Sequence, residues 1–139
     1  MNTLRYENIQ IGDEHRFFRF LTAQDAKIFS RLTGDVNPLH SDIAYSRKTK
    51  FERPILHGML AASLFSTLIG VYCPGKHALY MSQEVKFRKP IYMNTEVEVC
   101  GKVTKKVNAL KIVTLQTLIK DKASGEILVS GTAMAQVLV

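Results

Sequence analysis

The second half of the chain alternates apolar and polar residues with the period of two that is typical of a β-strand. The alternation is clearest between residues 95 and 107, where one face would carry Val97, Val99, Gly101 and Val103. Similar segments rich in β-branched residues are separated by turn-forming residues. Together with one earlier segment, the pattern predicts five strands, at residues 15–21, 79–87, 95–107, 110–120 and 127–139.

The first half of the chain predicts two helices. Thr22 and Asp25 form a capping box before an apolar stripe, which indicates a short helix that ends near Gly34. Residues 58–70 are apolar on nearly all sides, and a helix without a charged face has to be buried on every side. We therefore expect an antiparallel sheet curled around one buried helix, which is an α+β fold, in a single domain that spans residues 1–139.

Composition excludes several classes of protein. With 139 residues, of which 46% are hydrophobic, the chain can build one core but not two. The net charge of +7 favours a phosphorylated ligand or an acidic carrier protein, but the basic residues are scattered and form no nucleic-acid-binding motif. The N-terminus has no apolar signal segment, and no apolar run reaches the roughly 20 residues that span a membrane. Cys73 and Cys100 form no C-x-x-C pair, so we expect reduced thiols in a cytoplasmic protein.

The residues suited to chemistry gather between Thr33 and His40. Asp35 and His40 are five positions apart, and Asn37 and Pro38 between them favour a tight bend that would turn both side chains toward one point. A carboxylate beside an imidazole supplies an acid and a base near neutral pH. For this short string alone, the simpler interpretation is that the acidic and amide residues form a turn and the histidine is exposed.

His57 and Gly58 lead directly into the predicted buried helix. The first N–H groups of a helix are unpaired and lie at the positive end of its dipole, so Gly58 could offer an oxyanion hole to the carbonyl of a substrate. The simpler alternative is a glycine that only permits close packing. For His57, a structural or capping role is favoured over a catalytic one.

Two longer patterns make the assignment specific. The residues from Thr33 to Asp42, then Ala44, Thr49, Phe51 and the run from Pro54 to Met59, resemble the hydratase-2 motif. This motif marks the MaoC-like dehydratases and the (R)-specific enoyl-CoA hydratases, and the likeness extends from about Phe17 onward. The resemblance implies a hot-dog fold, in which a curved antiparallel sheet wraps one long helix. It also implies a homodimer that interconverts trans-2-enoyl-CoA and (R)-3-hydroxyacyl-CoA in a tunnel near the subunit interface.

The resemblance further implies roles for single residues. Asp35 and His40 would be the catalytic pair, the Gly58 N–H would bind the thioester oxygen, and Asn37 would support the loop. Ser66 would lie near the active site and Ile69 would contact the acyl chain, although Ile69 could equally be plain core. We expect no metal and no cofactor of the protein's own, because the thioester supplies the activation and the sequence contains no cluster of metal ligands.

The positive charge also suggests how the substrate would be held. Candidates to bind CoA phosphates or an acidic carrier protein are Lys48, Arg53, Arg88 and Lys89, each of which could instead be a solvated surface residue.

Two other functions compete with the hydration of CoA esters. One alternative is a 3-hydroxyacyl-carrier-protein dehydratase of fatty-acid synthesis, and another is a non-catalytic acyl-CoA-binding module. A thioesterase is less favoured, because the motif is that of hydratases.

Overall fold

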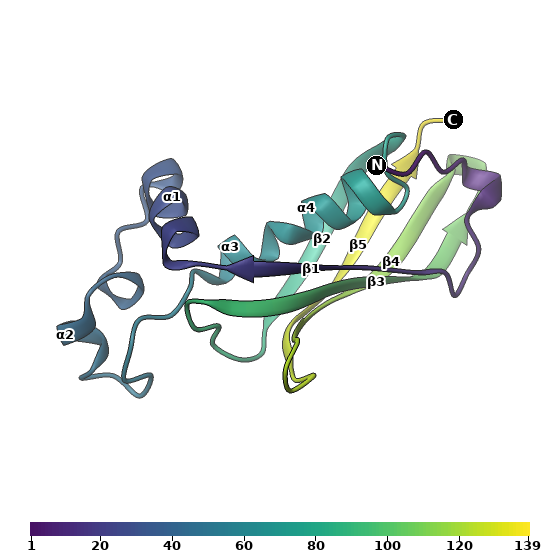
Figure 1. Ribbon diagram of the computed structural model, residues 1–139. Coiled ribbons are helices and arrows are strands. Elements are labelled where there is room, and N and C mark those ends of the chain that lie inside the picture. The colour runs from purple at the N-terminus through teal and green to yellow at the C-terminus, as the bar shows by residue number, and fades with distance from the viewer.

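A five-stranded antiparallel sheet forms the body of the molecule in the computed structural model, which describes all 139 residues (Figure 1). Its strands are β1 (Glu14–Leu21), β2 (Ala78–Phe87), β3 (Thr95–Val107), β4 (Ile112–Asp121) and β5 (Ile127–Val137). The strand order is β1-β3-β4-β5-β2, so β1 and β2 form the two edges of the sheet. All five predicted strands are confirmed, and no boundary differs by more than two residues.

A central helical segment lies along one face of this sheet (Figure 1). It consists of α3 (Gly58–Ala62), α4 (Leu64–Thr67) and a π-helical turn (Leu68–Tyr72). Val97 and Val99 are fully buried on the sheet face that packs against Phe65 and Leu68, as the alternation predicted. Where the segment crosses β3, a Cβ on Gly101 would lie 2.8 Å from Leu68 Cδ2, so any larger residue would require the Leu68 side chain to shift. The sheet and the central helix together confirm the α+β arrangement.

The expectation that this segment is buried on every side is wrong for the single chain. Met59 is 59% exposed, and Ser63, Ser66 and Gly70 on the same segment are also exposed. The physical reason is that one sheet covers only one side of a helix. The opposite side consists of small or apolar residues and is open to solvent.

The remaining helices project beyond one end of the sheet (Figure 1). They are α1 (Ala23–Thr33), a 3-10 turn (Pro38–His40) and α2 (Ile43–Ser46), and two further 3-10 turns lie at Tyr6–Asn8 and Asn108–Leu110. The predicted capping box is confirmed, because Thr22 Oγ1 accepts the Asp25 N–H at 3.1 Å and the Asp25 carboxylate accepts the Thr22 N–H at 2.8 Å.

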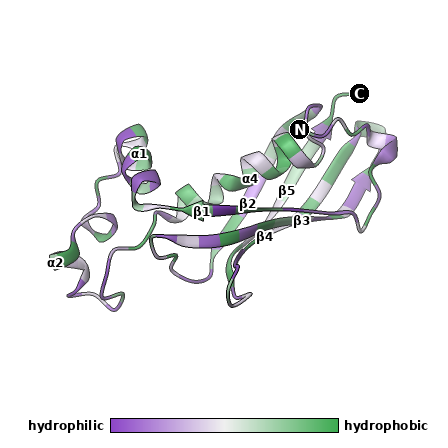
Figure 2. Ribbon diagram, viewed as in Figure 1, coloured by the Kyte–Doolittle hydropathy of each residue, from purple (hydrophilic) through white to green (hydrophobic).

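The hydropathy pattern of Figure 2 matches this architecture, with hydrophobic residues along the central helical segment and alternating character along the strands. Two buried clusters make up the core, and along the central segment Leu68 belongs to the first cluster and Ile69 to the second. No helix has the length and apolar character that crossing a membrane would require.

Candidate active site

The loop that follows α1 is shaped by its own side chains. Gly34 ends the helix with a left-handed φ of 79°, which residues with a Cβ rarely adopt. The Asp35 carboxylate accepts the Asn37 N–H at 3.1 Å. The Asn37 side chain in turn accepts a main-chain N–H at 3.0 Å within the turn that runs from Pro38 to His40. These successive bends bring Asp35 and His40 into one neighbourhood, and Asn37 holds the turn that carries His40.

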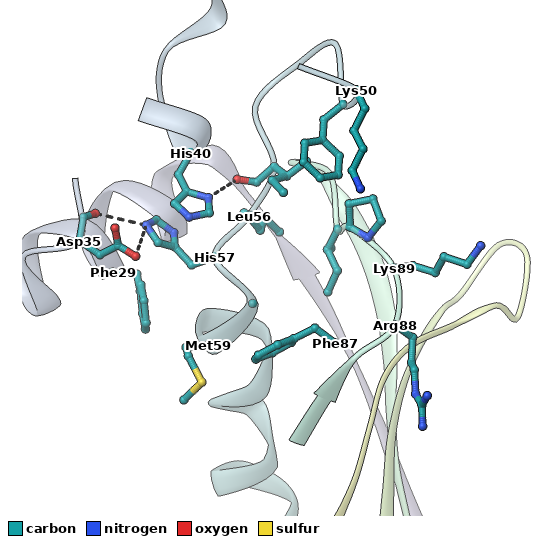
Figure 3. A pocket seen from close by; sticks show the side chains of 15 residues that line it. Phe29, Asp35, His40, Lys50, Leu56, His57, Met59, Phe87, Arg88 and Lys89 are labelled. Carbon is teal, nitrogen blue, oxygen red and sulfur yellow. Dashed lines mark hydrogen bonds and ion pairs between the residues drawn. The ribbon is translucent and has the colours of Figure 1, made fainter. Parts of the chain in front are cut away.

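Asp35, His40 and His57 form a compact cluster beside the start of α3 (Figure 3). The two imidazole rings stack with centroids 3.8 Å apart and planes inclined by 29°. One ring nitrogen of each histidine and one carboxylate oxygen of Asp35 all lie within 4.8 Å of one another. Two polar atoms that share one bridging water are about 4.6 Å apart. The Asp35 carboxylate and the His40 imidazole therefore lie close enough for one water to contact both.

The hydrogen bond of His40 assigns its tautomer. Its Nδ1 lies 2.9 Å from the main-chain carbonyl oxygen of Ile55 (Figure 3). A carbonyl can only accept, so Nδ1 carries the proton and the neutral ring keeps its lone pair on Nε2. His40 is thus set up to accept a proton at Nε2, with the half-exposed Asp35 carboxylate beside it.

His57 lies behind this pair, and its side chain is 2% exposed. Its Nε2 lies 3.1 Å from Ser30 Oγ and 3.3 Å from the main-chain oxygen of Asp35, and its ring meets Phe29 at a centroid distance of 5.0 Å. Burial, and next the neighbouring His40, lower the pKa of His57, while the nearby Asp35 carbonyl and carboxylate oppose this shift. His57 occupies the N-cap position of α3, but its side chain makes no capping hydrogen bond, so its burial supports the structural part of the prediction and not a side-chain cap.

A cavity of about 470 Å³ opens in front of the cluster, which is the size of a small-molecule site. Asp35, His40, His57 and Gly58 line it together. Gly58 is the first residue of α3, so its N–H has no acceptor within the helix. A Cβ on Gly58 would lie 2.8 Å from the ring of Phe87, which forms another wall of the cavity.

Three cations are among the residues that line the same cavity, namely Lys50, Arg88 and Lys89. The ends of Arg88 and Lys89 extend away from the cluster (Figure 3), where they meet Ser130 Oγ at 2.9 Å and Glu126 at 3.1 Å, respectively. Arg88 and Lys89 were among the expected phosphate-binding candidates, and Lys50 was not. Arg53 instead stacks on Tyr92, with 4.0 Å from its guanidinium carbon to the ring centroid, and lines a separate cavity of about 580 Å³ on the other side of His40. The residues lining either cavity do not include Lys48.

Two residues with expected roles lie away from the cavity. Ile69 is fully buried in a core cluster with Tyr6, Ile9 and Cys73. Ser66 is exposed on the open side of the central helical segment. Neither lines the cavity that holds Asp35 and His40, so the single chain does not bring them into the same site.

The expectation that the chain has no cluster of metal ligands is wrong, since Asp35, His40 and His57 lie close enough to share an ion. Their orientation, however, does not suit one. The lone pairs of an imidazole lie in the ring plane, and two rings stacked at 3.8 Å aim them along nearly parallel planes rather than at one point. The Nε2 of His57 is also taken up by Ser30 and by the Asp35 carbonyl.

Sequence reasoning missed Ser30, Phe29 and Phe87, which surround the cluster. Their contacts join segments far apart in the chain, and no local motif signals them. His57 was considered, but its stacking on His40 has no counterpart in the sequence pattern.

Comparison with known proteins identifies relatives along most of the chain. The family model described as MaoC like domain matches residues 9–123. The (R)-specific enoyl-CoA hydratase of Aeromonas caviae is 38% identical over 130 residues, which cover 94% of this chain and 96% of that protein. A solved structure described as the (R)-hydratase from A. caviae involved in PHA biosynthesis superposes with a TM-score of 0.90 at 37% identity, covering 94% of this chain and 98% of the other.

A second kind of relative matches a shorter part of the chain. A mitochondrial 3-hydroxyacyl-[acyl-carrier-protein] dehydratase of Arabidopsis thaliana is 38% identical over 89 residues, which cover 64% of this chain and 52% of that protein. The structural similarity confirms the hot-dog fold that the sequence motif implied.

Proposed function

This chain belongs to the MaoC-like family, and from that premise we propose that it is a hydratase that interconverts trans-2-enoyl thioesters and (R)-3-hydroxyacyl thioesters. The observation that carries the proposal is the proximity of Asp35 and His40, with polar atoms within 4.8 Å of each other, in a cavity that is also lined by the first residue of α3. The similarity to an (R)-specific hydratase over nearly the whole chain supports it.

The proposed reaction begins with the thioester carbonyl accepting the Gly58 N–H. This hydrogen bond makes C3 of the enoyl group electrophilic and stabilises the enolate that develops, an effect typically worth about 10²–10³ in rate. A water held between Asp35 and His40 attacks C3 and loses a proton to His40 Nε2. A proton from the same pair, which titrates as one unit, then goes to C2 on the same face. The sum is the addition of one water, and dehydration is the reverse path.

The charges at the cavity support a CoA thioester as substrate. Arg88 and Lys89 precede the apolar wall at Pro90 and Ile91, and Lys50 lies on the facing loop. Cations at the mouth of an apolar cavity suit a ligand with a phosphorylated handle and an apolar tail. A substrate bound to an acyl carrier protein carries the same phosphopantetheine, and the carrier-protein dehydratase relatives keep this as the second candidate.

We further propose that two copies pair. The edge strand β2 has one side without a neighbouring strand and exposes Leu79 and Met81, and the open side of the central helical segment exposes Met59. Sedimentation velocity is expected to give a dimer, and Met81→Glu is expected to weaken it. A monomeric wild-type protein would refute the pairing.

The test of the hydratase is a set of enoyl-CoA esters of increasing chain length, with hydration followed by the loss of enoyl absorbance and the product analysed on a chiral column. We expect the (R)-3-hydroxyacyl product. Matched carrier-protein substrates distinguish the second candidate, and release of free thiol would indicate a thioesterase instead. Stabilisation by acyl-CoA without turnover would refute catalysis and favour a binding module.

A further inference from the structure

His57 is the buried ionisable group of the site that the proposed reaction does not use. It is almost wholly buried, whereas His15, His40 and His77 are all partly exposed. Burying an imidazole is costly unless its polar atoms are satisfied. Its contacts therefore indicate what it does.

The two ring nitrogens of His57 have unlike surroundings. Nε2 lies near Ser30 Oγ and 3.3 Å from the Asp35 main-chain oxygen, which can only accept a hydrogen bond. Nδ1 is buried and has no partner. A proton on Nδ1 would leave a buried N–H without an acceptor, which folded proteins rarely contain. The single proton therefore belongs on Nε2, and the ring is neutral.

The ring face of His57 restrains His40. The two imidazoles stack at 3.8 Å, Phe29 closes the other side of His57 at 5.0 Å, and the Ile55 carbonyl fixes the far nitrogen of His40. The titratable groups in contact with His57 are Asp35 and His40, and α1 contributes only the uncharged Ser30 and Phe29. A charge on His57 would oppose a proton arriving on the stacked ring.

We propose that His57 is a positioning residue for the hydration reaction. As a neutral Nε2–H donor it holds the Asp35 main chain, and with its ring face it holds the His40 imidazole. The two proton-transfer groups thereby keep the separation that one water can bridge. The inference rests on the proposed function, and it assigns a role to a residue that acts through its two neighbours.

Two substitutions separate the donor from the ring. His57→Phe keeps a ring of similar size and removes the Nε2–H, so we expect kcat to fall about 10–100-fold, with KM within about twofold, because the Asp35 main chain loses its anchor. His57→Gln can place an amide N–H at the position of Nε2, so it is expected to retain more of kcat than the phenylalanine variant. His77→Gln, which changes a histidine outside the cavity, is the matched control and should keep wild-type kcat.

A double-mutant cycle distinguishes positioning from a merely structural role. Once His40→Ala has removed the group that His57 positions, adding His57→Phe should cost less than about twofold in kcat. The same loss in both backgrounds, or losses that simply follow thermal stability, would overturn the proposal. Wild-type kcat in His57→Phe would overturn it as well.

Nitrogen-15 NMR of the wild-type protein tests the tautomer without any turnover. We expect the His57 signals of a neutral ring protonated at Nε2 at about pH 7.5, one unit above the ordinary histidine pKa of about 6.5. An active enzyme with a charged or Nδ1-protonated His57 would overturn this inference alone. A wild-type protein that hydrates no enoyl thioester would overturn the proposed function, and this inference with it.

Discussion

Gly58→Ala tests whether the start of α3 and the wall of the cavity are fitted to each other. The added methyl group would lie 2.8, 2.9 and 3.2 Å from three atoms of the Phe87 ring. Ordinary carbon–carbon contacts are about 3.5–4.0 Å. The ring therefore has to move by roughly 0.7 Å or more to relieve the overlap. The Gly58 N–H itself is unchanged by this substitution.

Gly58→Ala should lower kcat more than it lowers the stability of the fold. Overpacking a closed core costs about 1–3 kcal/mol, but Phe87 is 53% exposed and can swing outward, so the expected change in stability lies at or below the low end of that range. Because Gly58 and Phe87 line the same cavity, the displacement changes the space for the thioester directly. A misplacement of about 1 Å can cost 10²-fold in rate, and we expect kcat for enoyl-CoA hydration to fall about 10–100-fold.

The assay is a cycle of Gly58→Ala, Phe87→Ala and the double variant, with kcat from the loss of enoyl absorbance and stability from urea denaturation. If the steric conflict is the cause, Gly58→Ala should lower kcat much less in the Phe87→Ala background than in the wild-type background. Equal kcat in wild-type and Gly58→Ala would refute the reasoning. So would a double variant whose losses simply multiply.

Three further predictions concern the charged groups. Asp35→Asn and His40→Ala should each lower kcat by roughly 10²–10⁴ while circular dichroism and thermal stability stay near wild type, and near-normal rates in both would remove the assignment. Burial lowers the pKa values of His57 and His15 from 6.5, so the folded state binds fewer protons than the unfolded chain. The urea midpoint should therefore fall as pH drops below about 6.5 toward 5, less so in His57→Phe, and a flat or rising midpoint would contradict the burial argument. Arg88→Ala should raise KM for enoyl-CoA several-fold and weaken the salt dependence of KM, with little change in kcat, and an unchanged KM would exclude this contact with the CoA phosphates.

The parts of the molecule that the sequence predicted are those determined by short-range chemistry. The period-two alternation located β3 without error at either end. Thr22 and Asp25 satisfy each other's main-chain groups within one turn, so the start of α1 could be read directly. The bend between Asp35 and His40 was equally predictable from the sequence, because Asp and Asn side chains accept hydrogen bonds from main-chain N–H groups two residues further on.

The rest of the site depends on contacts between distant segments. The stacking of His57 on His40 joins positions 17 residues apart across a loop whose path follows from tertiary packing. Phe87 reaches Gly58 only because β2 ends beside the start of α3. Ser66 and Ile69 were placed by analogy with a motif, and helical periodicity alone could not tell which faces of the central segment meet the sheet.

The prediction that the central helix is buried on every side was wrong for one chain, again because it depends on contacts that the sequence pattern does not specify. The exposed side that remains suggests that two chains pair. A helix without charged residues indicates that water is excluded from all its sides, and this statement concerns the protein in its working state rather than one chain. The sheet of one chain covers one side, and Met59, Ser63, Ser66 and Gly70 remain on the other. If two chains pair across this face and the β2 edge, as proposed, the apolar pattern becomes consistent along its whole length. Ser66 would then lie at the interface rather than on a free surface, and its expected place near the active site would depend on the second copy.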